Sequence, residues 1–399
     1  MLLQLRPQTP ATELAALRRE LSAAGLAAAP VSFFAAPIWR LEPATDNLPT
    51  AAPGRAALDA ILRRHPCVAA AFSGDFELAS RPLRPEGTRV RVATPGGELA
   101  IGGDEMVVIA GPCSVESWEQ IRDTAVAAAA AGARLLRGGA FKPRTSTYSF
   151  QGLGRQGLEL LAAAGRHAGL GVVTEVMAPE DVSLVAGYAD LLQVGARNMQ
   201  NFPLLKRLGE QRKPVLLKRG AGASIAEWLA AAEYLLARGN DQVVLCERGI
   251  RTFETYTRNT LDISAVAAAK ELVHLPVLVD PSHATGRRSL IAAASRAAVA
   301  AGADGLCVEV HVRPEESISD REQAISPDMF AALMSSLRPL VAACGRALAP
   351  ASARAAAPLP PAPALAPAPD AARVAASGAA ADLARDAALA PALAAPALP

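Results

Sequence analysis

The sequence predicts an α/β protein: a closed (β/α)8, or TIM, barrel preceded by a small α+β domain. The main observation is a series of eight near-continuous runs of Val, Leu and Ile, typical of parallel strands covered on both faces. The runs fall at 106–110, 134–137, 171–176, 191–195, 214–218, 242–246, 276–280 and 305–310. Ala-rich stretches with helical spacing lie between them. No Gly-x-Gly-x-x-Gly pattern follows the first run, which favours a closed barrel over a doubly wound sheet.

The first 85 residues are predicted to form a separate domain. Strands are expected at LLQL, within VSFFAAPIWRL and at CVAAAFSG, and helices from Thr12 to Ala28 and from Arg55 to Arg64. These elements predict a β-α-β-β-α-β order, which is the ferredoxin-like plan. Residues 86–105 are expected to be a linker and a β-hairpin, because RVRVAT and ELAIGG alternate on either side of a Pro-Gly-Gly turn. The barrel is then predicted over 106–346.

The composition changes at residue 347. The stretch ALAPASARAAAPLPPAPALAPAPDAARVAA consists mainly of Ala and Pro. Repeated Pro interrupts helices and sheets, and there are few bulky apolar side chains to bury. Residues 347–399 are therefore predicted to be a disordered tail.

Charge and cysteine usage limit the classes of partner. With 40 basic and 38 acidic residues, the chain has no global field directed at nucleic acid or a membrane. Five scattered cysteines do not form a disulfide framework and fit a reducing cytoplasm. The N-terminus lacks a secretion signal pattern, and no charge-free apolar stretch is long enough to span a membrane. We therefore expect a cytoplasmic protein with neither nucleic acid nor membrane as a partner.

Ionisable residues stand at the carboxyl end of every predicted strand, the face on which barrels carry their chemistry. In chain order they are Cys113, Arg137 with Lys142 and Arg144, Glu175, Arg197, Lys218 with Arg219, Glu247 with Arg248, His283, and Glu309 with His311. Converging cations repel one another unless an anion joins them, and guanidinium groups suit phosphate or carboxylate. The pattern predicts substrates with several negative charges. The alternative is that the cations pair with acidic residues across the rim.

A second set of residues has the chemistry of a metal site. It comprises Cys113, His283, Glu309 and Asp320, a mixture of soft and hard ligands compatible with Zn, Fe, Mn or Co. A single Cys or His is more often a packing residue, but here both are expected at the ends of barrel strands. The other cysteines, Cys67, Cys246, Cys307 and Cys344, are assigned to packing. His311 is a candidate neighbour of the site, and His65, His167 and His274 are expected at the surface or as caps.

These motifs closely resemble those of the 3-deoxy-D-arabino-heptulosonate 7-phosphate (DAHP) synthase family. The resemblance is carried by AGPCSVES, LRGGAFKPRTSTYSFQGLG, VTEV, QVGARNMQN, KPVLLKRG, CERGIRTFE, TRNTLDISAV, VDPSHATGRR and VEVH, spread from about residue 88 to 341. The best match is the short Iβ type with an N-terminal ferredoxin-like (ACT-like) domain. The resemblance implies condensation of phosphoenolpyruvate (PEP) with erythrose 4-phosphate and water, which yields DAHP and phosphate and opens the shikimate pathway. It also implies a homotetramer.

The resemblance implies a role for each matching residue. The divalent metal would be held by Cys113, His283, Glu309 and Asp320. Arg137 and Lys142 would face the PEP carboxylate, and Arg197, Lys218 and Arg248 its phosphate. Arg144 and Thr145 would hold the phosphate of the aldose. Glu175 and Lys142 are the candidates for handling the proton of the attacking water.

Two other functions remain open at this point. A 3-deoxy-D-manno-octulosonate 8-phosphate (KDO-8-phosphate) synthase shares the barrel and PEP, but typically has Lys-Ala-Asn-Arg-Ser where this chain has KPRTS at 142–146. A non-catalytic, effector-binding barrel would be expected to have lost some ligands or cations, and none is missing. For residues 1–85 we hypothesise feedback control by tyrosine or phenylalanine, the alternative being an oligomerisation element without a ligand.

Overall fold

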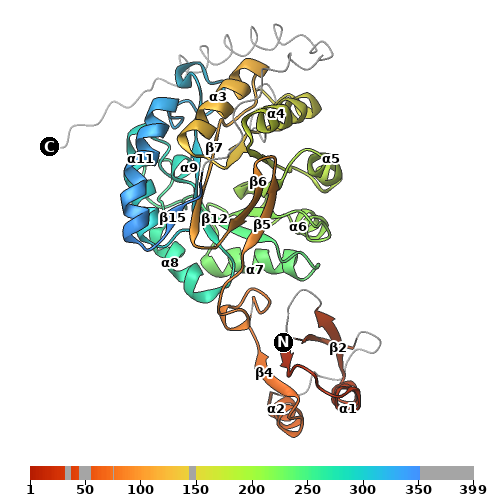
Figure 1. Ribbon diagram of the computed structural model, residues 1–399. Helices are drawn as coiled ribbons and strands as arrows, with labels where there is room; N and C mark the ends of the chain where they lie inside the picture. The colour runs from red at the N-terminus through yellow and green to blue at the C-terminus, as the bar shows by residue number, and fades with distance from the viewer. Residues whose placement is uncertain (32–36, 45–54, 75, 143–149, 351–399) are drawn as a thin grey trace, which may run out of the picture.

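The computed structural model describes residues 1–31, 37–44, 55–74, 76–142 and 150–350. Its largest part is the predicted eight-stranded parallel barrel (Figure 1). The strands are β7 (Glu105–Gly111), β8 (Leu135–Arg137), β9 (Gly171–Glu175), β10 (Leu191–Val194), β11 (Val215–Lys218), β12 (Val243–Glu247), β13 (Val277–Val279) and β14 (Gly305–Glu309). Neighbours pair in chain order, and β14 pairs with β7 to close the sheet. The predicted fold class is confirmed.

Helices surround the barrel, as expected from the Ala-rich stretches. They are α3 (Trp118–Ala131), α4 (Gly154–Ala168), α5 (Val182–Ala186), α6 (Phe202–Gly209), α7 (Ile225–Leu236), α8 (Ile263–Leu272), α9 (Pro281–Thr285), α10 (Ile291–Ala300) and α11 (Pro327–Ala343). Several begin at a side-chain cap that satisfies free backbone N–H groups. Ser117 caps α3, Ser326 caps α11, and Ser224 forms a reciprocal capping box with Glu227 at α7.

A β-hairpin seals the amino-terminal end of the barrel. It consists of β5 (Val90–Thr94) and β6 (Gly97–Ile101), paired in antiparallel fashion as predicted. Its buried side chains Val90, Val92, Leu99 and Ile101 share one apolar cluster with inward-facing residues of the barrel strands. The backbone N–H of Arg91 donates to Gln242, just before β12. This end of the barrel is therefore a closed apolar floor.

The N-terminal domain has the predicted ferredoxin-like plan. Its elements are β1 (Leu2–Leu5), α1 (Ala11–Ala23), β2 (Leu26–Val31), β3 (Ile38–Pro43), α2 (Arg55–Arg64) and β4 (Val68–Phe72). The antiparallel sheet has the order β2-β3-β1-β4. The expected helix to Ala28 was too long: Gly25, at φ +76°, ends the helical stretch, and Leu26 already belongs to β2. A glycine readily adopts this left-handed backbone, so it marks the boundary that Ala-rich composition hid.

The two domains meet through the segment that links them, residues 77–88. The carboxylate of Glu233 on α7 accepts hydrogen bonds from the backbone N–H groups of Leu78 and Ala79, at 2.6 and 3.1 Å. His274, next to β13, contacts the carbonyl oxygen of Leu78 and the hydroxyl of Thr88, each at 2.7 Å. His274 is 1% exposed, and His65 and His167 are also buried, so the surface alternative expected for these histidines was wrong. His167 lies in the last turn of α4 and His65 directly follows α2, positions that agree with the cap alternative.

The end of the barrel differs from the prediction. Residues 347 and 348, expected in the tail, form β15 (Ala347–Leu348), which pairs with the start of β7. The backbone N–H of Ala349 also donates to the carbonyl oxygen of Met106, at 3.0 Å. These residues are ordered because their backbone completes the edge pairing of β7. The rest of the expected tail, 351–399, lies outside the described residues.

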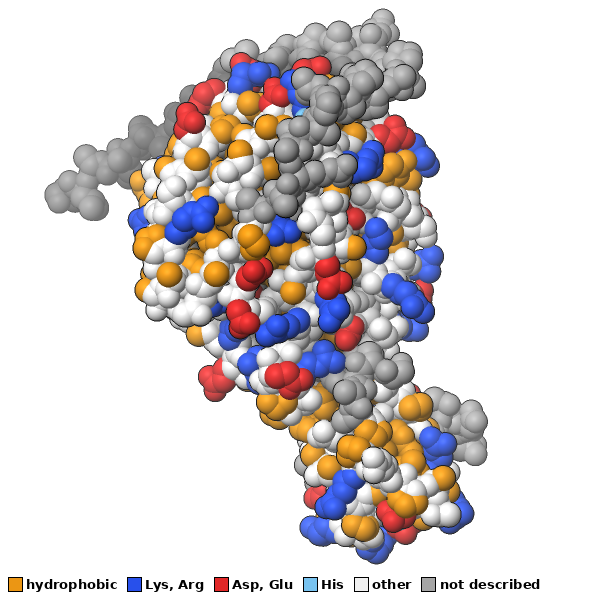
Figure 2. All heavy atoms as spheres, in the orientation of Figure 1, with side chains coloured by type: hydrophobic (Ala, Val, Ile, Leu, Met, Phe, Trp, Pro, Cys, Tyr) orange, Lys and Arg blue, Asp and Glu red, His pale blue; other side chains and the backbone are white. Residues whose placement is uncertain are grey.

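The surface agrees with the balanced composition. On the face that Figure 2 shows, acidic and basic side chains alternate over the barrel, and no large area carries a single sign of charge. Among the described residues, none of the helices is both long enough and apolar enough to cross a bilayer.

Candidate active site

A cavity of about 600 Å³ opens at the carboxyl ends of the barrel strands. Eight of the predicted site residues line it: Cys113, Arg137, Lys142, Glu175, Arg197, Lys218, Arg248 and His283. Asp320 lines it as well, and Glu309 lies directly behind it, next to Arg137 and His283. Arg144 and Thr145 lie outside the described residues. The structure thus brings together ten of the twelve predicted positions.

Cys113 follows β7 in a turn held by the neighbouring strand end. The carbonyl oxygen of Cys113 accepts from the N–H of Gly139, and the carbonyl oxygen of Gly139 from the N–H of Val115, each at 3.0 Å. These bonds continue the parallel pairing of β7 and β8 past the barrel rim. The thiol is therefore fixed by backbone contacts rather than by side-chain packing alone.

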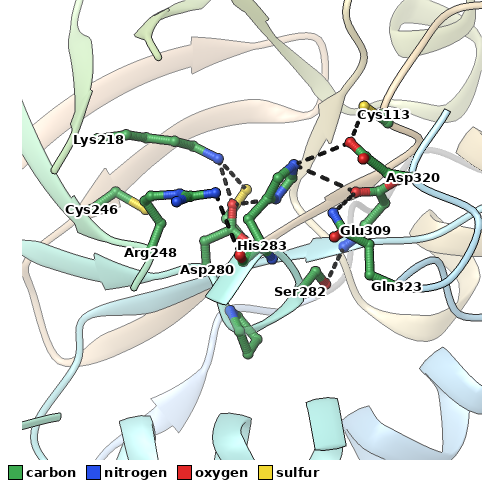
Figure 3. A network of polar contacts seen from close by, with 12 residues as sticks. Cys113, Lys218, Cys246, Arg248, Asp280, Ser282, His283, Glu309, Asp320 and Gln323 are labelled. Atoms are coloured by element: carbon green, nitrogen blue, oxygen red, sulfur yellow. Dashed lines mark hydrogen bonds and ion pairs between the residues drawn. The ribbon is translucent and has the colours of Figure 1, made fainter. Parts of the chain in front are cut away.

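His283 is positioned by the short helix α9. Asp280 caps this helix: its Oδ1 accepts from the backbone N–H of His283 at 2.9 Å. Its other oxygen, Oδ2, lies 2.8 Å from Nδ1 of the same imidazole and 2.5 Å from Nζ of Lys218. One buried carboxylate thus orients both the imidazole and the ammonium group, leaving Nε2 of His283 facing the cavity side (Figure 3).

Glu309 and Asp320 complete the cluster. Glu309 is the last residue of β14, and its Oε2 accepts a hydrogen bond from Nε2 of Gln323 at 2.8 Å. Asp320, in the following loop, has a φ of +56°, an uncommon backbone conformation that Asp tolerates better than most residues. The sulfur of Cys113 lies 3.0 Å from Oδ2 of Asp320.

The four predicted metal-ligand side chains therefore converge. One ligand atom each from Cys113, His283, Glu309 and Asp320 lies within 4.8 Å of all the others (Figure 3). Oε1 of Glu309 is buried and has no hydrogen-bond partner among the described residues. A buried carboxylate oxygen without a donor is costly unless a cation satisfies it. The donor set and this oxygen both fit a divalent metal ion.

Burial shapes the protonation of the cluster. It lowers the pKa of His283 to about 3 despite the nearby carboxylate of Asp280, so the imidazole is neutral, the form that binds metals. Burial raises the pKa of Glu309 to about 7, although the positive charge of Arg137 acts to lower it. Burial and then the charge of Glu309 raise the pKa of the Cys113 thiol. A bound cation would favour the ionised carboxylate and thiolate.

The predicted cations surround the rest of the cavity. Lys142 donates to the carbonyl oxygen of Cys113 at 2.7 Å and lies 2.8 Å from its sulfur. Arg137 lies 3.6 Å from Glu309. Burial acts to lower the pKa of Lys218, but the carboxylate of Asp280 together with Cys307 and Cys246 outweighs it and leaves the pKa raised. These side chains are positively charged and already oriented before any anion arrives.

Glu175 enters the cavity beside these cations. Its carboxylate fills the space next to Gly195: a Cβ atom on that glycine would lie 2.0 Å from Oε1 of Glu175. Only a residue without a side chain fits there. Burial raises the pKa of Glu175, although Lys142 and Lys218 act in the opposite direction. The carboxyl group is thus placed to hold or release a proton in the cavity.

Three other expectations need correction or refinement. Arg219, counted among the converging cations, is bound to Glu247 at 3.0 Å and to Asp262 at 2.9 Å, so here the alternative of pairing across the rim is right. His311, expected as a neighbour of the site, is two residues after the predicted ligand Glu309 and contacts Glu116 at 3.4 Å. Cys344, assigned to packing, is exposed.

Sequence reasoning assigned no role to several residues of the site. They are Asp280, which orients His283 and Lys218, and Gln323, which donates to Glu309. Arg251, Arg258 and Asn259, which line the cavity, also belong to this set. Asp280 and Arg258 stand inside the quoted motifs VDPSHATGRR and TRNTLDISAV. Their charges were the available signal: Asp280 directly follows β13, whereas Arg258 lies in the segment between β12 and α8, away from the strand ends.

A (β/α)8 barrel whose mouth combines four metal-ligand side chains with a ring of cations defines an enzyme acting on anionic substrates. The model of the DAHP synthetase I family matches residues 87–342. Phospho-2-dehydro-3-deoxyheptonate aldolase of Thermotoga maritima is 50% identical over 270 residues, covering 68% of this chain and 79% of the relative. The chain therefore belongs to the DAHP synthetase I family, and with it to the first step of the shikimate pathway.

Solved structures agree. The crystal structure of the DAHP synthase of Thermotoga maritima has a TM-score of 0.68 and 41% identity, covering 87% of this chain and 99% of that one. A truncated form of the Thermotoga enzyme covers 69% of this chain and 100% of its own, with a TM-score of 0.64 and 46% identity. A 2-dehydro-3-deoxyphosphooctonate aldolase of Acidithiobacillus ferrooxidans is less similar, at 33% identity over 54% of this chain and 83% of the relative.

Proposed function

We propose that the chain condenses PEP with erythrose 4-phosphate and water to give DAHP and phosphate, using a divalent metal ion. The observation that carries the proposal is one cavity lined by seven Lys and Arg side chains and by Cys113, His283 and Asp320, with the fourth metal-ligand side chain, Glu309, directly behind it. Cys113, His283, Glu309 and Asp320 would hold the ion, with Mn, Fe, Zn and Co all compatible with the donor set. When bound, the metal would act as a Lewis acid on the aldose carbonyl oxygen.

The cations bind and orient PEP. Arg137 and Lys142, on the metal side, face the carboxylate, while Arg197, Lys218 and Arg248 hold the phosphate. Because Lys218 is already fixed by Asp280, its charge needs little reorganisation as phosphate leaves. Holding both substrates in one cavity also reduces the entropic barrier to their reaction. Arg144 and Thr145 are proposed to bind the phosphate of the aldose.

Proton transfer is assigned to side chains close to the reacting atoms. Glu175 has a raised pKa and borders the cavity, so it can take up the proton of the water that adds to PEP. Lys142 is the other candidate, because it lines the cavity and its ammonium group lies 2.8 Å from the sulfur of Cys113. A Glu175→Gln variant that keeps full kcat would leave this role to Lys142.

Product identification tests the proposed reaction. The enzyme is incubated with PEP and either erythrose 4-phosphate or arabinose 5-phosphate, with and without a chelator. We expect DAHP from erythrose 4-phosphate and loss of turnover after chelation. A preference for arabinose 5-phosphate would instead indicate the KDO-8-phosphate synthase reaction, and absence of turnover with either aldose would indicate a non-catalytic, effector-binding barrel.

For the N-terminal domain we propose binding of tyrosine or phenylalanine and feedback inhibition. Residues 1–85 support this because they form a sheet with its own apolar core, attached at the end of the barrel away from the cavity. Deleting residues 1–85 should abolish inhibition and spare catalysis. Full-length enzyme that is unaffected by both amino acids would contradict the proposal. The homotetramer is also proposed, to be checked by light scattering, and a cytoplasmic location remains a prediction.

A further inference from the structure

Arg258 contacts the metal-ligand cluster from a separate loop. Its NH1 nitrogen donates to Oδ1 of Asp320 at 3.1 Å and to Oε1 of Gln323 at 2.9 Å. Arg258 belongs to the segment between β12 and α8, whereas Asp320 and Gln323 belong to the loop between β14 and α11. One guanidinium group thus joins two loops that are far apart in the sequence.

Gln323 continues this line of contacts to the second carboxylate. Its amide oxygen accepts from Arg258, and its amide nitrogen donates to Oε2 of Glu309 at 2.8 Å. The carboxylates of Asp320 and Glu309 are therefore linked through two intervening side chains (Figure 3 shows the Gln323–Glu309 part). We call the four residues Asp320, Arg258, Gln323 and Glu309 the carboxylate bridge.

The same loop is attached to the helix that carries the imidazole ligand. The backbone N–H of Arg258 donates to the carbonyl oxygen of Thr285 at 3.0 Å, and the N–H of Asn259 to that of Ala284 at 2.8 Å. Both acceptors belong to α9, directly after His283. The position of Arg258 is therefore set relative to one ligand while its side chain holds another.

We propose that Arg258 and Gln323 are positioning residues that fix the two carboxylates for the metal ion. The inference rests on the proposed metal site and deepens it. Asp320 needs such support because it stands in a loop with a left-handed backbone, outside any regular element. Partners of this kind orient ligands, and their loss typically weakens metal binding by about 10- to 100-fold.

The sign of the effect separates positioning from simple electrostatics. A guanidinium group near a divalent cation repels it, so charge alone predicts that removing Arg258 strengthens metal binding. Positioning predicts weaker binding, because Asp320 and Gln323 lose their common donor. The side chain of Arg258 is 40% exposed, and ion pairs at such positions add little to folding stability. Its removal should therefore leave the metal-free fold intact.

The test is a titration of chelator-treated full-length enzyme with Co²⁺, followed by the thiolate-to-cobalt absorption that reports on Cys113. We expect about 10- to 100-fold weaker binding in Arg258→Ala and in Gln323→Ala, with partial rescue in Arg258→Lys. The Co²⁺ affinity of the double variant should lie within about threefold of that of the weaker-binding single variant. The two effects should not add, because both substitutions break the same carboxylate bridge. The melting temperature of the metal-free forms is measured alongside.

Arg251→Ala is the matched control: it removes a positive charge from the same cavity, and no contact of Arg251 with the four ligands is among those described. Its Co²⁺ affinity should be unchanged or higher. Arg258→Ala with wild-type or tighter affinity would overturn the inference, as would an equal loss in Arg251→Ala. If the wild type shows no thiolate absorption, or Cys113→Ala binds Co²⁺ equally well, the proposed metal site itself fails, and the inference with it.

Discussion

The two ends of the barrel are built from the same strands and have opposite character. At the carboxyl ends, buried ions such as Lys218 and Asp280 form pairs around a polar cavity. At the amino ends, the hairpin side chains Val92 and Ile101 pack in one apolar cluster with inward-facing residues of the strands. Buried ion pairs contribute little net stability, whereas apolar burial is the main favourable term in folding.

Function and stability are therefore separated along the barrel axis: the residues of the cavity lie at the carboxyl ends of the strands, and the apolar cluster of the hairpin lies at their amino ends. The mouth holds like charges together, and Oε1 of Glu309 has no partner in the part of the chain that the structure describes; both features disfavour the folded state. The floor and the helix shell compensate for this. Substitutions at the mouth that leave its buried ion pairs intact should therefore change activity with little change in stability, and substitutions at the floor should do the reverse.

The largest effect is expected for Cys113→Ala. Loss of the sulfur ligand should remove the metal and reduce kcat/KM at least about a thousandfold, or about 4 kcal/mol of transition-state stabilisation. The melting temperature should change by only a few degrees. Steady-state kinetics and metal analysis measure this, with the exposed Cys344→Ala as the control. Full activity in metal-free buffer would contradict the assignment of Cys113 as a ligand.

Lys218→Ala should come next. The ammonium group is proposed to hold the phosphate of PEP, and losing a buried charged partner typically costs about 2–5 kcal/mol. We expect kcat/KM for PEP to fall by about two orders of magnitude or more. Lys270→Ala is the matched control, because Lys270 pairs with Asp304 away from the cavity. Unchanged kinetics in Lys218→Ala would move the phosphate site elsewhere.

At the floor, Ile101→Ala should lower stability rather than activity. Truncating a fully buried Ile leaves a cavity and costs about 2–5 kcal/mol in the free energy of unfolding. Denaturant unfolding measures the loss, and kcat/KM of the folded enzyme should stay at the wild-type value. Leu272→Ala, at a partly exposed position on α8, should be much milder. If Ile101→Ala instead impaired catalysis at full stability, the separation of the two ends would be wrong.

The smallest expected effect is a pH dependence of the free energy of unfolding that arises from Glu233 at the junction of the two domains. Burial raises the pKa of Glu233 from 4.5 to about 7, so the folded state binds a proton that the unfolded chain has already released. Stability should therefore fall as pH rises between these two values, by no more than about 3 kcal/mol. Urea unfolding at several pH values should show this slope, and Glu233→Gln should reduce it. An unchanged slope in the variant would assign the pH dependence to other groups.

Much of this architecture was predictable because it depends on local patterns. Apolar runs located all eight strands, since a parallel strand covered on both faces leaves no polar alternation. Residues just after those runs supplied Cys113, Arg137 and Glu309, because a barrel gathers its strand ends on one face. The hairpin also followed from alternation around a turn. The roles of the site residues remain predictions.

What could not be predicted depends on contacts between distant loops. Arg258 and Gln323 became neighbours only through folding, and nothing in the local sequence of either residue indicates that it contacts the other. His274 was expected at the surface or as a cap because no pattern in the sequence places the linker against it. The pairing of residues 347 and 348 was hidden by an Ala- and Pro-rich composition, since backbone pairing needs no particular side chain.

The strand β7 is paired at its start with β15 and along the rest of its length with β14, segments about two hundred residues later in the chain. During synthesis, one edge of this first barrel strand therefore keeps unpaired backbone N–H and C=O groups until almost the whole barrel has been made. Contacts of such long range slow folding, and an unpaired edge invites association with other chains. The step most exposed to aggregation should thus be ring closure.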